Sequence, residues 1–427
     1  MPLSDTTDIA QELIDTVVDF LHDDQASLFS SSLVARNWVP ATRYHLFERI
    51  RIHHFFTRAV DSRYSMHDTA RQFLDICSSP FCTILPFIRD VVLNVETPFE
   101  SQEVLLKQLV DVFAQAPVTK LVFVDHTKFK PTMEPISLIW LGPRFSGLRH
   151  LSYNALDRFA LDTLALVAHF PELQSLSLCS STKNAARTAF TQSKPYPSLA
   201  PASFAHLRTL SLRLFSHQSQ EFMAWLRTGG DHIRLETLDL VVFHAYHNGW
   251  GPIAALNAFL SANGTELREF GFRLRYEDDH NVELPILLSH DDDDELDLGG
   301  LTNLRSLRLG SHNVEAICTT LSSLPPDLHT LKTFELLFRE WIHYEAHPCP
   351  CNPRLLVREF ADVMRRDQFA SLTAFTILIP EIFGDGWKDG LKQFFPRWKD
   401  TDVLRLRSLD AFQSSFDTWE SIKDTLL

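Results

Sequence analysis

One short apolar phrase recurs along most of the chain, and it constrains the fold more than any other feature. The phrase is L-x-x-L-x-L with apolar substitutions, and its copies are Ile88-Val91-Leu93, Val118-Leu121-Phe123, Leu148-Leu151-Tyr153, Leu173-Leu176-Leu178, Leu207-Leu210-Leu212, Leu235-Leu238-Leu240, Leu267-Phe270-Phe272, Leu304-Leu307-Leu309, Leu331-Phe334-Leu336 and Leu372-Phe375-Ile377. A degenerate eleventh copy lies around Leu404 and Leu406. The mean spacing is about 31 residues, a period that indicates an array of structural repeats.

Each copy of the phrase predicts one strand, because its last two apolar positions lie two residues apart and point to the same face. The intervals between copies carry apolar residues at helical spacing. The helices expected there are Ser101–Ala116, Leu161–Phe170, Gln220–Arg227, Pro252–Ala262, Val314–Leu324 and Pro353–Asp367. We therefore predict an α/β fold in which strands and helices alternate and neighbouring strands are parallel.

The phrase and its alternation with helices resemble the leucine-rich-repeat family over residues 88–410. The irregular spacing, and the lack of a regular asparagine after the strand, are similar to the long, degenerate α/β forms of that family. The resemblance implies an irregular, horseshoe-shaped solenoid in which each unit buries its apolar face on the next. The alternative is an ordinary α/β domain whose strands are rich in leucine.

The first fifty residues lie outside this repeat and predict three short helices. The apolar stripe of the first helix is formed by Leu13, Ile14, Val17, Val18 and Leu21. Asp8 is a suitable cap for this helix, Asp23 or Asp24 caps the second, and the third follows Pro40. Three helices of this size make too small a core to be very stable alone, so a docking partner would add stability.

The amino-acid sequence of these helices resembles an F-box over residues 9–47. Glu12-Leu13-Ile14-Asp15, then Val17-Val18 and Leu21, is similar to the first helix of that family. Ser32-Leu33-Val34-Ala35-Arg36-Asn37-Trp38, then Pro40-Ala41 and Arg43-Tyr44-His45-Leu46-Phe47, resembles the C-terminal half found in large fungal F-box families. Two positions depart from the pattern: Ile9-Ala10 stands where Leu-Pro is common, and Ala35 where cysteine is common. The missing proline is expected to weaken the contact with the linker subunit without abolishing it.

This resemblance implies a non-catalytic adaptor of a Skp–cullin–F-box ubiquitin ligase. The F-box (residues 1–50) would dock on a Skp-type linker and through it on a cullin, and the solenoid (88–410) would hold an unknown target protein. Residues 51–87 would form a helical connector and residues 411–427 a C-terminal helical cap. The linker-binding residues implied are Ile9, Leu13, Ile14, Val17, Val18, Leu21, Leu33, Val34 and Trp38. Alternatively, the apolar stripe only caps the first repeat, and the protein is a binding scaffold with no ligase role.

The third, fifth and seventh positions of each phrase are expected to face away from the core, because side chains alternate along a strand. In the later repeats these positions carry Arg213, Arg273, Arg308, Arg405 and Arg407. We hypothesise that these arginines bind an acidic or phosphorylated segment of the target, since guanidinium groups pair with oxyanions. The alternative is that they pair with Asp239, Glu269 and Glu335 across neighbouring strands.

Other groups of residues give little indication of a metal, cofactor or catalytic site. His343, His347, Cys349 and Cys351 offer four potential zinc ligands, but the Cys-x-Cys gap is tight and a loop insertion explains the segment as well. The acidic run of residues 291–295 lacks calcium-loop spacing and is interpreted as a solvated loop. We find no glycine-rich phosphate loop, nucleophile elbow or dinucleotide fingerprint, and expect no cofactor and no enzyme. A hydrolase site assembled only in space is the remaining alternative.

Charge and composition narrow the environment of the protein. The net charge of −14 argues against sequence-independent binding of nucleic acid, which requires a basic face. Six cysteines are too few for a disulfide scaffold in 427 residues, and no apolar run reaches the length of a membrane span. Residues 1–20 contain no lysine or arginine and do not resemble a secretory signal. The cytosol or the nucleus is therefore the expected compartment.

Overall fold

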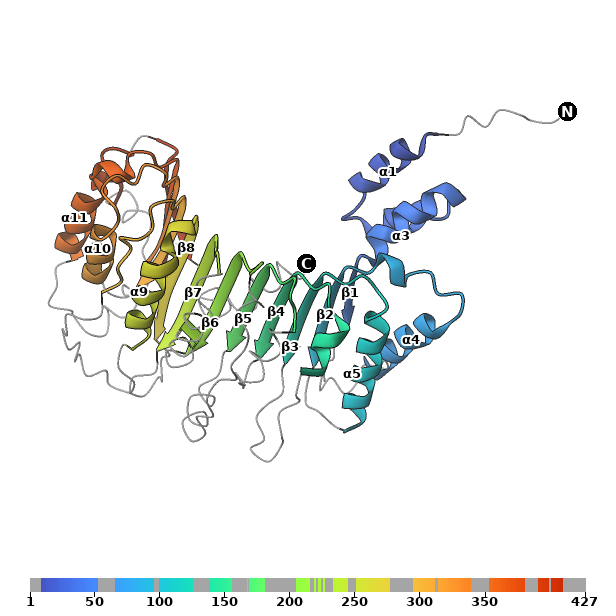
Figure 1. The fold of residues 1–427 in the computed structure, drawn as a ribbon. Helices are drawn as coiled ribbons and strands as arrows, with labels where there is room; N and C mark the ends of the chain where they lie inside the picture. Colours follow the sequence, from blue (N-terminus) through green and yellow to red (C-terminus); the bar gives the residue numbers. More distant parts are fainter. Residues whose placement is uncertain are drawn as a thin grey trace, which may run out of the picture. The chain divides into compact units, whose positions relative to one another are not determined.

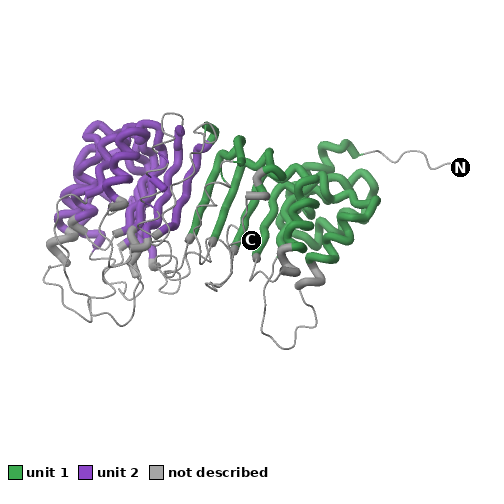
Figure 2. Tube along the Cα trace, turned by 60° about the horizontal axis from the view of Figure 1, so that its bottom comes forward, with its two compact units in different colours: residues 1–185, 194–206 green, residues 186–193, 207–427 purple. Residues whose placement is uncertain are grey.

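A computed structural model describes most of the chain. The described residues are 9–52, 66–95, 100–125, 139–155, 167, 169–180, 205–215, 219, 222–223, 226, 233–244, 251–276, 295–311, 314–338, 353–380, 391–398 and 401–409. The chain divides into two compact units (Figure 2). Unit 1 comprises Met1–Ala185 with Lys194–His206, and unit 2 comprises Ala186–Ser193 with Leu207–Leu427.

Unit 1 begins with the three short helices that the sequence predicts (Figure 1). They are α1 (Gln11–Phe20), α2 (Gln25–Ser31) and α3 (Val39–Phe47). Asp24 caps α2, because its carboxylate accepts hydrogen bonds from the backbone N–H groups of Ala26 and Ser27. Pro40 lies in the first turn of α3. An N–H group in this turn has no hydrogen-bond partner within the helix, so the lack of one in proline costs nothing there. A 3-10 turn, η1 (Arg36–Trp38), leads into α3.

The described strands of unit 1 pair in parallel and in chain order. They are β1 (Arg49–Ile52), β2 (Asp90–Val95), β3 (Lys120–Asp125), β4 (His150–Ala155) and β5 (Ser175–Ser180). The helical segments between them are α4 (Met66–Ser78), η2 (Leu85–Phe87), α5 (Glu100–Phe113) and η3 (Ile139–Arg144). The stack of Phe73 on Phe113, with ring centroids 5.3 Å apart, joins α4 to α5.

The parallel sheet begins earlier than the sequence analysis placed it. We expected the first strand at residue 88, but β1 already pairs with β2 through Arg49–Ile52. Helix α4 lies in the segment between them. The repeated phrase is in fact present here, as Phe47-Ile50-Ile52, with Phe47 in the position that Ile88 has before β2. It was missed because Phe47 was assigned to the third N-terminal helix.

Unit 2 continues the same alternation of strands and helices. Its described strands are β6 (Thr209–Phe215), β7 (Thr237–His244), β8 (Glu269–Tyr276), β9 (Ser306–Ser311), β10 (Thr333–Phe338), β11 (Ala374–Pro380) and β12 (Leu404–Leu409). They also pair in parallel and in chain order. The helical segments are α9 (Gly251–Asn263), η6 (Gly264–Glu266), α10 (Val314–Ser322), α11 (Pro353–Met364) and η9 (Asp367–Phe369).

The predicted α/β fold with parallel strands is confirmed. All eleven copies of the repeated phrase coincide with strands, β2 to β12. The leucines align in register, so that Leu121, Leu151 and Leu176 occupy equivalent positions on neighbouring strands and are all buried. Within each unit, the strands therefore contribute apolar, inward-facing side chains at equivalent positions to the core, which is what the period-2 pattern predicts.

The core of unit 2 lies between strands and helices. Phe360 of α11 packs against Phe334 of β10 and Phe375 of β11, with ring centroids 6.5 and 6.2 Å apart. Phe395 and Trp398 meet Phe375 edge-on. Aromatic burial of this extent is a large stabilising term, and it fixes α11 against the strands. The predicted helix at residues 411–427 lies outside the described residues, as do most of Leu161–Phe170 and Gln220–Arg227.

Candidate partner-binding surfaces

The N-terminal helices have a small core of their own. Ile14 and Val18 of α1 and Leu28 of α2 are buried against one another. The partly buried side chains that pack on them are Leu21, Trp38, Ala41 and Leu46. All of these residues come from the three helices and their connections, so the described side chains of the sheet contribute nothing to this cluster.

Two apolar stripes run along α1, and only one of them is used for packing. Ile14, Val18 and Leu21 turn inward. Leu13 and Val17, each one residue earlier, lie about 100° around the helix and face solvent. Phe20 continues this outer stripe and is 84% exposed. The helix therefore presents a row of large apolar side chains that its own fold does not bury.

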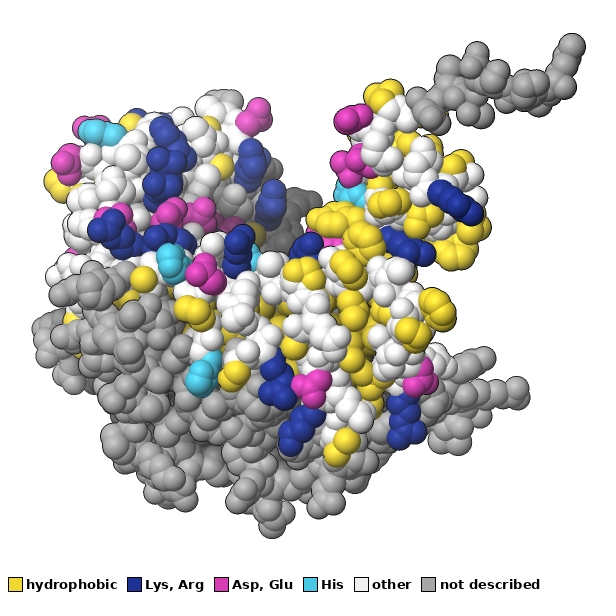
Figure 3. All heavy atoms as spheres, turned by 45° about the vertical axis from the view of Figure 1, so that its right-hand side comes forward, with side chains coloured by type: hydrophobic (Ala, Val, Ile, Leu, Met, Phe, Trp, Pro, Cys, Tyr) yellow, Lys and Arg dark blue, Asp and Glu magenta, His cyan; other side chains and the backbone are white. Residues whose placement is uncertain are grey.

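More apolar side chains are exposed on and after α2. Phe29 lies on α2, and Leu33 and Val34 follow its end. A hydrogen bond from Gln11 to the carbonyl oxygen of Asn37 ties the start of α1 to the segment after them. We call the exposed set the N-terminal apolar face, and it consists of Ile9, Leu13, Val17, Phe20, Phe29, Leu33 and Val34. Figure 3 shows hydrophobic side chains at the surface of this part of the molecule.

The structure divides the nine residues that the sequence analysis grouped as linker-binding. Ile14 and Val18 are core residues, and Leu21 and Trp38 are partly buried on that core. The other five, Ile9, Leu13, Val17, Leu33 and Val34, are between 47% and 74% exposed. Phe20 and Phe29 belong to the exposed face but were missed. The spacing of Phe20 from Leu13 and Val17, at i+7 and i+3, was the signal that identifies it.

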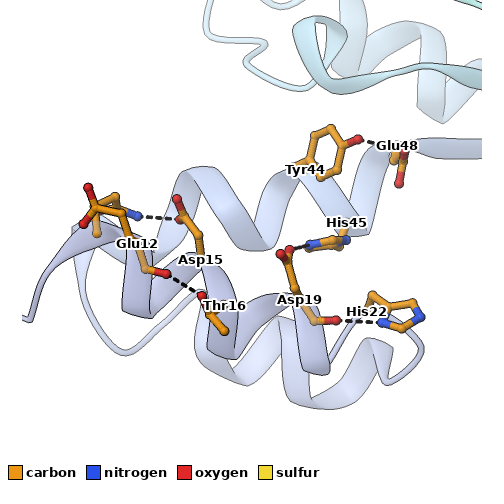
Figure 4. Close-up of polar contacts among 9 residues, drawn as sticks. Glu12, Asp15, Thr16, Asp19, His22, Tyr44, His45 and Glu48 are labelled. Atoms are coloured by element: carbon orange, nitrogen blue, oxygen red, sulfur yellow. Dashed lines mark hydrogen bonds and ion pairs between the residues drawn. The ribbon is translucent and has the colours of Figure 1, made fainter.

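Polar contacts hold the helices in this arrangement (Figure 4). His45 of α3 lies 2.8 Å from the carboxylate of Asp19 on α1, joining the two helices. The Tyr44 hydroxyl donates a hydrogen bond to Glu48, and this bond raises the pKa of Tyr44 above its ordinary value. The backbone carbonyl of Glu48 accepts hydrogen bonds from the N–H groups of Arg89 and Asp90, at 2.9 Å each. The helices are thereby linked directly to the edge of the sheet.

In unit 2 the five predicted arginines fall into two rows that cross the strands. The first row, in pairing order from β6 to β12, is Ser211, Asp239, Gly271, Arg308, Glu335, Thr376 and Arg405. The second row is Arg213, Val241, Arg273, Gly310, Leu337, Leu378 and Arg407. Residues two apart on a strand share a face, so both rows lie on one face of the sheet of unit 2, about 7 Å apart.

Two ion pairs in these rows each reach over an intervening strand. The Arg308 guanidinium lies 3.7 Å from Asp239, and β8 with Gly271 runs between their strands. The Asp239 carboxylate lies over this glycine: a Cβ atom at position 271 would come within 2.1 Å of its Oδ1. The absence of a side chain at Gly271 is thus required for the contact.

The second ion pair joins Arg273 of β8 to Glu335 of β10, at 3.5 Å, and passes over Gly310 of β9. A Cβ atom at Gly310 would lie 3.3 Å from Cγ of Arg273. The sequence analysis left open whether the arginines pair with acidic residues, and for Arg273 and Arg308 they do. The partners stand two strands away rather than on the neighbouring strand. Glu269, the third acidic residue considered, is exposed.

The remaining arginines are arranged differently. Arg405 is exposed and its Nε donates a hydrogen bond to the carbonyl oxygen of Asp402, at 3.3 Å. Arg407, two residues further on β12, is also exposed. Arg213 of β6 is half-buried. The five arginines therefore share a face, with two of them in ion pairs and two exposed at the last described strand.

The third, fifth and seventh phrase positions were expected to face away from the core, but this does not make all of them accessible. The buried residues at these positions are Val92, Asn94, Val122, Val124, Asn154 and Cys179 in unit 1, and Val241, Gly271, Gly310 and Leu337 in unit 2. In-register strands lie about 4.8 Å apart, so equivalent side chains on neighbours such as Val92 and Val122 cover one another. This face of unit 1 consequently offers less accessible surface than alternation alone predicts.

Within the described part of the chain, no group of three or more His, Cys, Asp or Glu side chains is placed to hold a metal ion. The possible zinc ligands His343, His347, Cys349 and Cys351 lie outside the described residues, as do residues 291–294 of the acidic run. None of the described helices is both long and apolar enough to cross a membrane.

Comparison with known proteins gives no assignment, since neither a family model nor a curated protein matches this sequence.

Proposed function

We propose that this protein is the substrate-recognition adaptor of a Skp–cullin–F-box ubiquitin ligase, acting in the cytosol or the nucleus. The N-terminal helices would form the F-box that docks on a Skp-type linker, and through it on a cullin. The strand–helix units would form an irregular leucine-rich-repeat solenoid that holds the target protein. In this role the chain performs no chemistry of its own and carries no cofactor.

The observation that carries the proposal is the N-terminal apolar face. Seven large apolar side chains within residues 9–34 are exposed, although the helices already have a core in Ile14, Val18 and Leu28. Exposed apolar groups contribute nothing to the stability of the isolated helices. A cluster of them marks a surface that another protein buries, and an exposed row on a helix suits a helical partner.

A capping role for the helices is the competing interpretation, and the packing favours the docking role over it. A cap would bury its apolar stripe on the first strand. Here the buried stripe of α1 packs on α2 and α3, and the outer stripe with Leu13 and Val17 faces solvent. The contact with the sheet is made instead through backbone hydrogen bonds to the carbonyl of Glu48.

The experiment that tests the proposal is co-purification of the full chain with a Skp-type linker protein. The informative variant is Leu13→Asp/Val17→Asp, because both side chains are exposed and their replacement leaves the helical core intact. The matched control is Val104→Asp on α5, which changes an equally exposed apolar residue outside the apolar face. Trp38 is less suitable for this test, since it packs on the core and its loss would disturb folding.

We expect the wild type and Val104→Asp to retain the linker, and the double variant to bind it at least a hundredfold more weakly, about 3 kcal/mol. Circular dichroism would show that all three proteins are folded. If the folded wild type fails to bind, the ligase role is wrong and the protein is better explained as a binding scaffold.

A further inference from the structure

We propose that the two arginine rows of unit 2 bind an acidic, carboxylate-bearing segment of a partner protein. The inference deepens the proposed function, and rests on it only in identifying that partner as the ligase target. The face carries the five arginines Arg213, Arg273, Arg308, Arg405 and Arg407, and at the phrase positions of β6 to β12 only three carboxylates, those of Asp239, Glu269 and Glu335. This local positive excess lies on a chain whose net charge is −14.

The second row is the more basic of the two. Its charged members are Arg213, Arg273 and Arg407, and the described residues between them are apolar or glycine. With strands about 4.8 Å apart, the row extends for about 29 Å from β6 to β12. A line of cations separated by uncharged positions attracts an anionic segment that follows the row. The half-buried Leu378 is available to the apolar side chains of such a segment, whereas Val241 and Leu337 are buried.

The two ion pairs orient Arg273 and Arg308 but use only some of their N–H donors. A guanidinium group has five N–H donors, and one carboxylate engages at most two. The separations of 3.5 Å for Arg273–Glu335 and 3.7 Å for Arg308–Asp239 are longer than the 2.7–2.9 Å of a direct charge-assisted hydrogen bond. Arg273 and Arg308 are therefore held over the sheet with donors left for a ligand, and less side-chain entropy is lost when one binds.

Arg405 and Arg407 provide the accessible end of the surface. Both are exposed and lie two residues apart on β12, so their Cα atoms are separated by about 7 Å. Each of these two arginines ends one of the rows. An acidic segment that follows the rows across the strands therefore reaches accessible guanidinium groups at β12, where bidentate pairing with its carboxylates is available.

The test uses the full chain and defined peptides. One labelled peptide alternates glutamate with serine, a second has glutamine in place of every glutamate, and a third has phosphoserine in those places. Binding is measured by fluorescence anisotropy at two salt concentrations. The protein variants are Arg405→Gln/Arg407→Gln and, as a control, Arg366→Gln, an exposed arginine after α11 that lies outside the rows.

We expect the glutamate peptide to bind at least tenfold more tightly than the glutamine peptide, and more weakly at high salt. The double variant should lose about tenfold in affinity, and Arg366→Gln should bind like the wild type. Equal affinity for the glutamate and glutamine peptides, no effect of the double variant, or binding of the phosphoserine peptide alone would each overturn the proposal.

Failure of this proposal is distinguishable from failure of the ligase role. Linker capture depends on the N-terminal apolar face in unit 1, so Arg405→Gln/Arg407→Gln should retain the linker as well as the wild type does. Peptide binding without linker capture would contradict the ligase role alone. Linker capture without selective binding of the glutamate peptide would contradict only the arginine surface.

Discussion

The guanidinium of Arg273 lies 3.5 Å from the carboxylate of Glu335, although a whole strand, β9, runs between β8 and β10. The contact is possible because Gly310 stands at the crossing point. The same device recurs at Gly271, between Asp239 and Arg308. Glycine is unfavourable in strands because it loses more backbone entropy on folding than other residues, and here it provides the space in which charges meet across a strand.

Replacement of Gly271 by alanine should reveal this dependence. The new Cβ atom would overlap Oδ1 of Asp239, so the carboxylate must move and its contact with Arg308 is lost. We expect the free energy of unfolding in urea to fall by about 1–2 kcal/mol. In an Asp239→Ala background the obstacle is absent, and the same change should be neutral or stabilise by about 0.5 kcal/mol. An equal cost in both backgrounds would contradict the steric explanation.

The two stripes of α1 should respond differently to truncation. Ile14→Ala removes a fully buried side chain from a small core, and we expect a loss of about 2–5 kcal/mol, enough to open the helices. Leu13→Ala changes an exposed side chain and should cost no more than about 0.5 kcal/mol. Hydrogen exchange over Gln11–Phe20, followed by mass spectrometry, measures both effects. Similar exchange in the two variants would show that the stripes are not distinct.

The cap of α2 should give the helices a specific response to acid. Hydrogen bonds from the Ser27 hydroxyl and from the backbone N–H groups of Ser27 and Ala26 hold the pKa of Asp24 below its ordinary 3.8. Because the folded pKa is the lower one, the stabilisation is complete above pH 3.8 and disappears as the pH falls through the folded pKa.

The prediction can be checked by NMR titration of Asp24 and by acid unfolding. In Ser27→Ala the pKa of Asp24 should move back toward 3.8, since its strongest hydrogen bond is lost. Asp24→Asn keeps an acceptor for the backbone and should show a smaller loss of stability below pH 3.8 than the wild type. A pKa unchanged by Ser27→Ala would show that the hydroxyl is not the cause.

Cys77, at the end of α4, should be an unreactive thiol. Burial and the adjacent Cys82 thiol raise the pKa of Cys77 to about 12. The thiolate is the form that reacts with iodoacetamide, so at pH 8 we expect Cys77 to be alkylated at least a hundredfold more slowly than the partly exposed Cys318. Mass spectrometry of timed samples measures the two rates, and unfolding in urea should equalise them. Fast labelling of native Cys77 would contradict the raised pKa.

The sequence predicts the regular part of this fold well and the placement of individual side chains poorly. Strand positions follow from apolar residues at a spacing of two, a local signal that survives variation in the intervals, and it locates β2 to β12. Strand β1 carries the same signal in Ile50 and Ile52, but it directly follows α3 and was hidden because Phe47 was assigned to that helix. Local periodicity also predicts α1. It does not separate the buried stripe of this helix from the exposed one, because that distinction arises only when α2 and α3 pack against one side of α1.

The contacts made by the arginine rows, and the burial of the strand positions beside them, depend on distances between strands. A local sequence pattern does not give these distances. The pairing of Arg308 with Asp239 requires the register of three strands and the missing side chain of Gly271. The burial of Val92 depends equally on its neighbour Val122. Residue type and alternation identify the arginines and place them on one face, but their partners follow from tertiary structure.

Within each unit, strands that are consecutive in the chain are paired with one another. Such an order means that no connection has to be threaded past another, and a loop between two strands can lengthen without shifting the pairing beside it. The stretch from β10 to β11 is longer than the stretch from β9 to β10, yet all three strands remain in register. Insertions and deletions in the loops can therefore accumulate while the pairing of the strands is kept. Lineages of such a protein are free to diversify the loop surface quickly and to change the strand face one residue at a time.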